Sequence, residues 1–266
     1  MSQAGPARPE PTRKPESVYI LGCRVDRVDS DAAAAQIGEL VRRGAAAQVV
    51  TLGAEMANLA YADRSYRDVI NAADLVVPDT IGIVLASRLL GAPVPERVAG
   101  VDLLERACAD AAASGWGVFF LGSAPDVARA AADALTARHP GLHVVGTEDG
   151  YFADADVPKL CARIRESGAR LIFVGIGFPR QERFIHDNLA QLGLCVGIGV
   201  GGSFDVIAGR LPRAPAAVRA AGLEWLYRLA REPRRLRRQL ALPVFAMRTL
   251  RQSVSARVGA AQPQVK

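Results

Sequence analysis

The 266-residue sequence has few aromatic residues and lacks an apolar run long enough to form a membrane-spanning helix. Aromatic side chains make up 6% of the chain, whereas half of its residues are apolar. We therefore expect an aliphatic core in one large α/β domain, or in one domain with an appendage. Residues 1–16 are rich in proline and charge, lack an apolar signal core, and are expected to form a disordered lead.

Cysteine and histidine are scarce and widely spaced. The four cysteines form no CxxC pair, so thiols in a reducing cytoplasm fit better than disulfides or a zinc site. The three histidines lack ligand spacing, and no Ser-His-Asp set with nucleophile-elbow spacing is present. Two Asp-x-Asp sequences, at 29–31 and 154–156, fall at expected helix starts and are interpreted as helix caps. We predict no metal and no cofactor.

The sequence also lacks a Walker A motif and the GxGxxG dinucleotide fingerprint. It has instead glycine-containing strand-to-helix turns at 122–125 and 175–179, and a glycine-dense run at 197–202. Such turns expose backbone N–H groups that bind phosphate, although glycine can also serve only to permit a tight turn. The candidate substrate-binding residues of these regions are Gly122, Ser123, Tyr151, Gly175, Gly177 and Gly201.

Short apolar runs alternate with helical stretches over residues 17–209. Several of the runs are apolar throughout, which is typical of strands buried on both faces of a sheet. This alternation predicts an α/β catalytic domain over 17–209, with a Rossmann-like parallel sheet and helices on both faces. Strands are expected at 17–22, 46–52, 117–121, 142–146, 171–175 and 195–200, and in an apolar run that ends at Asp79.

Asp79 follows an apolar run at the point where a strand is expected to end. Open α/β sheets bind ligands at the carboxyl ends of their strands, and Arg97 follows within one helix and a turn. A carboxylate near a fixed cation suits the deprotonation of a hydroxyl beside an anionic leaving group. Gln181, just after Pro179, is expected to face the same edge, whereas Glu182 is expected to be a solvated helix cap.

The C-terminal residues 210–266 carry 13 Lys and Arg against 2 Asp and Glu, while the rest of the chain is mildly acidic. Arginine-rich helices are expected at 216–231 and 233–252. Interleaved apolar side chains fit a helix at an anionic bilayer surface, and a solvated face, nucleic-acid binding or a contact between copies of the chain are the alternatives. We predict a membrane-associating appendage at 210–252, a disordered tail at 253–266 and no nucleic-acid partner.

Several short segments occur in a fixed order over residues 17–251. They are Val50–Leu52, Pro78–Gly82, Glu96–Leu103, Gly175–Glu182, Gly199–Asp205, Arg213–Pro215, Gly222–Leu229 and Glu232–Arg235. Together they resemble the WecG/TagA/CpsF glycosyltransferase family (glycosyltransferase family 26), which moves a sugar from a nucleotide sugar to a lipid-linked acceptor.

The resemblance implies an inverting, metal-independent transfer from a UDP-sugar to an undecaprenyl-diphosphate-linked acceptor in surface polysaccharide or exopolysaccharide synthesis. The enzyme would act at the cytoplasmic face of the cytoplasmic membrane. Its donor would carry N-acetylmannosamine, the uronic acid of that sugar, or glucose. The resemblance also implies that Asp79 is the general base, that Thr51, Arg97 and Gln181 lie in the pocket, and that Arg97 offsets charge on the departing diphosphate. Appendage arginines would reach the site, and the candidates are Arg228, Arg231, Arg235 and Arg238.

Two positions depart from the family pattern. The family often has asparagine where this chain has Gly53, and usually has glycine where it has Thr80. Gly53 lacks a side chain that could form a hydrogen bond with the sugar, so the transferred sugar could differ from N-acetylmannosamine. Thr80 adds bulk beside the base and could narrow the acceptor site. The alternative to an enzyme is a non-catalytic nucleotide-binding regulator with a basic tail, which would bind UDP without turning over any UDP-sugar.

Overall fold

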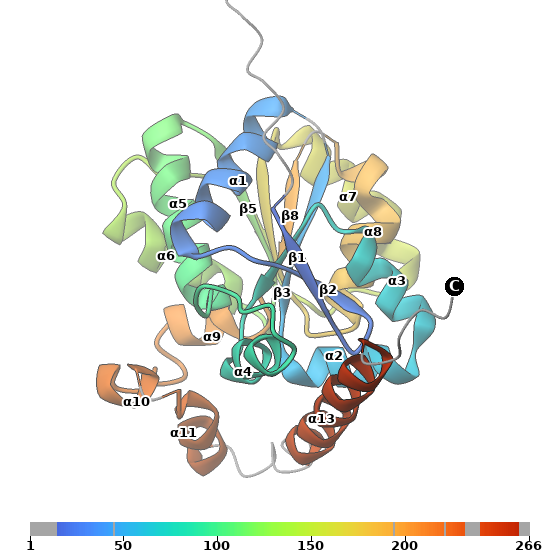
Figure 1. The fold of residues 1–266 in the computed structure, drawn as a ribbon. Helices are drawn as coiled ribbons and strands as arrows, with labels where there is room; N and C mark the ends of the chain where they lie inside the picture. Colours follow the sequence, from blue (N-terminus) through green and yellow to red (C-terminus); the bar gives the residue numbers. More distant parts are fainter. Residues whose placement is uncertain (1–14, 45, 194, 221, 232–239, 261–266) are drawn as a thin grey trace, which may run out of the picture.

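A computed structural model describes residues 15–44, 46–193, 195–220, 222–231 and 240–260. Its centre is a six-stranded sheet flanked by helices (Figure 1). In sheet order the strands are β4 (Leu75–Pro78), β3 (Ala47–Leu52), β8 (Val196–Gly199), β7 (Leu171–Gly175), β5 (Gly117–Gly122) and β6 (His143–Glu148). Each neighbouring pair is parallel, which confirms the predicted Rossmann-like architecture.

Helices cover both faces of the sheet because each presents one apolar stripe to the buried strands. On one face, one core cluster joins the strands to α1 (Ser30–Arg43), α5 (Gly100–Ser114), α6 (Val127–Arg138) and α9 (Ser203–Ile207). The other face is covered by α3 (Arg64–Ala72), α7 (Val157–Glu166) and α8 (Arg180–Leu192). Helices α2 (Ala54–Ala62) and α4 (Ile81–Leu89) begin just after the carboxyl ends of β3 and β4.

The first expected strand does not join the parallel sheet. β1 (Ser17–Ile20) pairs antiparallel with β2 (Cys23–Asp26) in a separate two-stranded sheet. The turn residues Leu21 and Gly22 have φ values of 52° and 83°, the backbone twist that suits a two-residue hairpin. The apolar pattern identified β1 as a strand, but β2 alternates polar and apolar residues and was not predicted.

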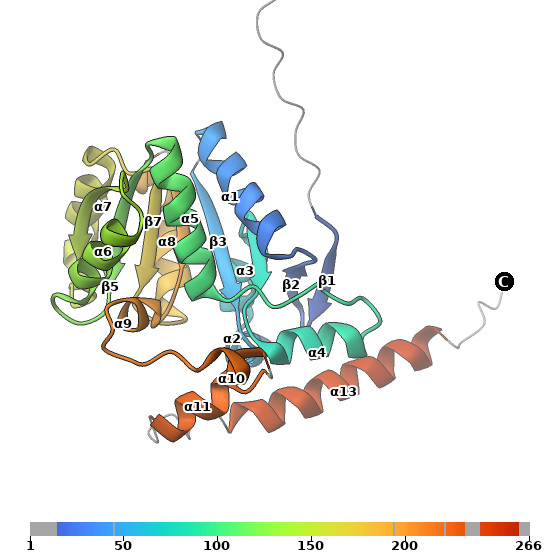
Figure 2. The same ribbon diagram turned by 90° about the vertical axis from the view of Figure 1, so that its left-hand side faces the viewer.

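The C-terminal segment forms α10 (Ala216–Ala220), α11 (Glu224–Arg231) and α13 (Ala241–Ala260), and α13 runs alongside α4 (Figure 2). The helix predicted over 216–231 is interrupted at Gly222, where φ is 71°. Helix α13 continues to Ala260, beyond the predicted end, and Ser253 is buried there with its hydroxyl bonded to Leu89 O (3.1 Å). Residues 233–239 of the second predicted helix and 261–266 of the predicted tail lie outside the described residues.

All four cysteines lie within the described chain as buried, unpaired thiols. Burial raises the pKa of Cys23 and of Cys195 to about 12.

Among the described residues, the structure contains no helix with both the length and the apolar character needed to cross a bilayer.

Candidate active site

Asp79 lies at the carboxyl end of β4, where the chain turns into α4. Its N–H donates to Leu52 O of β3 (3.0 Å), and its carboxylate Oδ1 accepts a 2.7 Å hydrogen bond from the N–H of Gly100. Gly100 is the first residue of α5, so the carboxylate is held at a helix N-terminus, where the helix dipole favours negative charge. The residue is half-buried. A fixed carboxylate therefore stands at the sheet edge, as the sequence predicted.

Thr51, the penultimate residue of β3, borders the same helix start. A Cβ atom on Gly100 would lie 3.5 Å from Thr51 Oγ1, so Thr51 and Asp79 both adjoin the first residue of α5. The Thr51 hydroxyl is buried and donates to Gly199 O of β8 (2.8 Å). Its proton therefore ties β3 to β8, and its oxygen can still accept a hydrogen bond from a ligand.

Arg97 is positioned by the segment between α4 and α5. The N–H of Val98 donates to Pro78 O (2.8 Å), which fixes the segment against the end of β4. The Arg97 guanidinium forms an ion pair with Glu224 of α11, with 2.9 Å between Nη1 and Oε2. The two side chains are 22% and 10% exposed, so the pair is largely desolvated. The sequence did not predict the role of Glu224, because no local pattern indicates a contact between residues 127 positions apart.

Gln181, on the first turn of α8, is 2% exposed and has polar partners on both sides of its amide. Its Nε2 donates to Glu182 Oε1 (2.7 Å), and its Oε1 accepts from the N–H of Gly201 (3.1 Å). Gln181 therefore holds the glycine loop after β8, and its place in the substrate pocket stays a prediction.

Glu182 is fully buried, so the expectation of a solvated cap is wrong. Its Oε2 accepts a hydrogen bond from the Tyr66 hydroxyl (3.0 Å), because α3 packs against α8 at this point. Burial raises the pKa of the Glu182 carboxyl. Burial also raises the pKa of Tyr66, and the adjacent Glu182 carboxylate raises it further.

Three glycines bring the carboxyl ends of β5, β7 and β8 into close contact. A Cβ atom on Gly122 would lie 2.5 Å from the carbonyl oxygen of Gly175, and one on Gly175 would lie 2.8 Å from Gly201 O. Gly122 and Gly175 therefore exclude side chains, because neighbouring backbone atoms lie too close to leave room for one. Gly177 and Gly201 differ, because their φ values are 79° and 52° and their Cβ directions meet no atom within 4 Å among the described residues.

Ser123 joins this row of glycines to α9. Its N–H donates to Gly175 O (2.9 Å), and its hydroxyl donates to Asp205 Oδ2 (3.1 Å). Ser123 also has a φ of 59°, a conformation that non-glycine residues seldom adopt. Asp205 therefore orients the Ser123 side chain.

Tyr151 lies in the loop after β6, beside Ser123. The N–H of Gly150 donates to Ser123 O (2.9 Å), and Tyr151 itself is 77% exposed. Arg180 donates to the backbone carbonyl oxygens of the residues before and after Tyr151, which are Gly150 (3.1 Å) and Phe152 (3.0 Å). The structure thus groups an exposed aromatic ring with the glycine row. No local pattern around Arg180 indicates that it braces this loop.

The appendage arginines are described only in part. Arg231 is exposed on α11, and its guanidinium lies 5.6 Å from the centre of the Tyr227 ring. Arg228 belongs to the same helix, but the structure does not describe its side chain. Arg235 and Arg238 lie outside the described residues. The predicted contact between these arginines and the sheet edge is therefore still a prediction.

No group of three or more His, Cys, Asp and Glu residues in the described part of the chain is arranged to hold a metal ion. The first Asp-x-Asp sequence caps a helix as predicted, since Asp29 accepts from the N–H of Ala32 (2.8 Å). The second forms a single 3-10 turn (Asp154–Asp156) before α7.

The chain matches a known protein family and is similar in sequence to several known proteins. A model of the family described as "Glycosyl transferase WecG/TagA/CpsF family" matches residues 18–259. Three relatives are each named N-acetylglucosaminyldiphosphoundecaprenol N-acetyl-beta-D-mannosaminyltransferase. The protein from Bacillus subtilis (strain 168) is 32% identical over 82% of this chain and 84% of its own length. The one from Bacillus spizizenii is 36% identical over 76% and 78%, and the one from Staphylococcus aureus (strain MW2) is 35% identical over 74% and 77%.

Proposed function

Because the chain belongs to the WecG/TagA/CpsF family of glycosyl transferases, we propose that it moves a sugar from a UDP-sugar to an undecaprenyl-diphosphate-linked acceptor. The names of the relatives support this acceptor class, and they favour N-acetylmannosamine as the sugar. The uronic acid of that sugar and glucose are the alternative donors. The product would be an intermediate of surface polysaccharide or exopolysaccharide synthesis.

The placement of Asp79 supports the proposal most directly. The acceptor hydroxyl gives its proton to the Asp79 carboxylate as the acceptor oxygen attacks the anomeric carbon. The bond from that carbon to the UDP oxygen breaks on the opposite side, which inverts the configuration. The hydrogen bond from Gly100 fixes the carboxylate before substrate arrives, so little reorientation is needed.

Arg97 would stabilise the negative charge that develops on the departing UDP. A guanidinium suits a diphosphate because it can donate two parallel hydrogen bonds. We propose that Arg97 and the appendage arginines Arg228, Arg231 and Arg235 fill the part that a divalent cation fills in other transferases. A chelator should then leave the turnover unchanged, and a strict requirement for Mg²⁺ or Mn²⁺ would contradict this part of the proposal.

The UDP moiety would lie across the carboxyl ends of β5, β7 and β8. The exposed ring of Tyr151 suits stacking on a uracil base, and its loop is joined to Ser123 through the hydrogen bond from the N–H of Gly150. The open Cβ direction of Gly177 leaves room for a phosphate to approach the backbone. Gln181 would act here by holding Gly201 in place.

Residues 210–252 would form the appendage that meets the cytoplasmic face of the membrane. Exposed apolar side chains support this assignment, and they are Leu223, Trp225, Leu226, Leu240, Met247 and Leu250. The full chain should sediment with anionic liposomes, whereas residues 1–209 alone should not. Salt-sensitive binding to DNA that ignores lipid would favour a nucleic-acid partner, and a concentration-dependent dimer would favour a contact between copies.

A donor screen tests the function itself. Each UDP-sugar is incubated with a short-chain, diphosphate-linked N-acetylglucosamine acceptor, and released UDP is measured with and without acceptor. We expect acceptor-dependent release with one of the three donors. Tight UDP binding without turnover of any donor would favour the non-catalytic regulator.

A further inference from the structure

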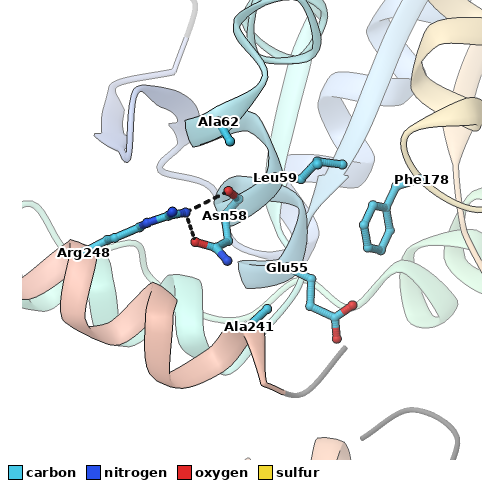
Figure 3. A pocket seen from close by; sticks show the side chains of 7 residues that line it. All are labelled: Glu55, Asn58, Leu59, Ala62, Phe178, Ala241 and Arg248. Carbon is cyan, nitrogen blue, oxygen red and sulfur yellow. Dashed lines mark hydrogen bonds between the residues drawn. The ribbon is translucent and has the colours of Figure 1, made fainter. Parts of the chain in front are cut away.

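A groove lies between α2 and α13, beside the candidate active site (Figure 3). Its volume is about 370 Å³, within the range of ligand sites. Helix α2 and helix α13 form its two sides, and Phe178, from the turn after β7, contributes an aromatic ring. The lining residues are Glu55, Asn58, Leu59, Ala62, Phe178, Ala241 and Arg248, and most of the lining surface is apolar.

One end of the groove adjoins the sheet edge that carries Asp79. Glu55 belongs to the first turn of α2, and the N–H of the preceding Ala54 donates to Thr80 Oγ1 (3.1 Å). Thr80 directly follows Asp79 in the chain. The Glu55 end of the groove therefore lies near the part of the chain that carries Asp79.

The polar groups of the groove argue against a polar occupant. The Arg248 guanidinium is already engaged, since Nη1 bonds to the backbone and side-chain oxygens of Asn58 and the group lies 4.4 Å from the centre of the Tyr61 ring. Arg248 thus braces α13 against α2. At the other end, the Glu55 carboxylate repels an anionic group, so a diphosphate is disfavoured inside the groove.

Helix α13 also carries exposed apolar side chains, with Met247, Leu250 and Val254 each about half exposed. The groove therefore lies between a sheet edge suited to a sugar diphosphate and a helix with apolar surface. A diphosphate joined to a long branched hydrocarbon matches this order of surfaces, because its head is anionic and its chain has no polar atoms.

We propose that the groove between α2 and α13 binds the first isoprenoid units of the acceptor, next to its diphosphate. This inference rests on the proposed function, which supplies the acceptor class. The apolar chain leaves the bilayer at α13, lies against Leu59 and Phe178, and presents the sugar to Asp79. Binding in the groove thus orients the acceptor hydroxyl, a task that bilayer partitioning alone does not perform.

The test compares two soluble acceptors that share one amino-sugar diphosphate head, one with a single isoprene unit and one with four, in the absence of membrane. The wild-type kcat/KM should be at least about tenfold higher for the four-unit acceptor, because burial of a few methylene groups suffices for that factor. The exposed Ala62 is replaced by tryptophan to fill the groove. Ala62→Trp should bring the ratio of the two kcat/KM values close to one, because it raises the KM of the four-unit acceptor much more than that of the one-unit acceptor.

Leu85→Trp is the matched control, since it adds the same ring to an exposed position of α4 outside the groove. A wild-type enzyme that uses both acceptors equally, or an Ala62→Trp enzyme that keeps the preference, would overturn the proposal and leave the transferase function standing. Failure of every acceptor would count against the proposed function instead. In that event, a four-unit prenyl diphosphate with a photoreactive end tests the groove without turnover. Labelling of α2 or α13 would support binding in the groove, and labelling elsewhere would refute it.

Discussion

The carboxyl edge of the sheet and the C-terminal segment are built in different ways. At the edge, backbone groups do the positioning: Asp79 bonds to Leu52 O through its N–H and to the Gly100 N–H through its carboxylate. The C-terminal segment is attached to the body largely by side chains, as in the Arg97–Glu224 pair and the contact of Arg248 with Asn58.

This difference separates two tasks. Backbone hydrogen bonds persist when surface side chains change, so the edge is preorganised by the fold itself. Side-chain attachments can be removed one at a time, so the contribution of the C-terminal segment can be tested without disturbing the sheet. The following predictions use this separation, beginning with the largest effect.

Removal of the base should have the largest effect. Asp79→Asn keeps the shape of the side chain and an oxygen that can accept from Gly100, but it cannot take a proton at neutral pH. We expect kcat to fall by about 10³-fold, the middle of the range for a general base. Initial rates of UDP release measure this, and UDP binding by calorimetry should be unchanged. Turnover near the wild-type rate would remove Asp79 from the mechanism.

The buried Glu182 should make the stability of the body depend on pH. Burial raises the pKa of Glu182 from its usual value of 4.5, so the folded state holds the proton more tightly than the unfolded state does. The stability that this proton confers is complete below pH 4.5 and is lost as the pH rises through the raised pKa.

Glu182→Gln should abolish this dependence. Denaturation curves between pH 4 and 8 should show the wild type losing stability relative to the variant as the pH rises, because its carboxyl must give up a proton in the buried site. Parallel curves for the two proteins would show that the carboxyl has its ordinary pKa.

Glu224 should affect catalysis through Arg97. Glu224→Gln removes the charge that orients the guanidinium, and we expect kcat to fall about tenfold with little change in the KM of the donor. Asp102→Asn is the matched control, because it breaks another ion pair to the C-terminal segment, with Arg213, at a more exposed place. Equal losses in both variants would mean that the pairs only attach the segment.

Gly53 and Thr80 should act as one unit, with the smallest effect. A Cβ atom on Gly53 would lie 3.3 Å from Thr80 Cγ2, so a side chain at 53 competes with the Thr80 methyl group for space. Gly53→Asn should lower kcat/KM a few-fold, and adding Thr80→Gly should restore part of the loss. Thr80→Gly also removes the hydrogen bond that the N–H of Ala54 donates to Thr80 Oγ1, which should lower the free energy of unfolding by about 1 kcal/mol. Strictly additive effects in the double-mutant cycle would show that the two positions are independent.

The sequence predicted what depends on local pattern. Apolar runs located the strands of the parallel sheet, and the end of one run located Asp79 at the sheet edge. It could not predict contacts that depend on tertiary packing. Glu182 looked like a surface residue at a helix start, and only the approach of α3 encloses it against Tyr66. The partnership of Arg97 with Glu224 likewise depends on where α11 lies against the body.

The side chain of Gln252 in α13, the last described helix, bonds to the first hairpin. It accepts from the N–H of Leu21 at the hairpin turn (2.9 Å) and donates to Tyr19 O of β1 (2.8 Å). Leu21 and Gln252 are 231 positions apart, and a ribosome makes the hairpin before it makes α13. The clasp can therefore close only after all of the chain between them has been synthesised, and until then the groove lacks one of its walls.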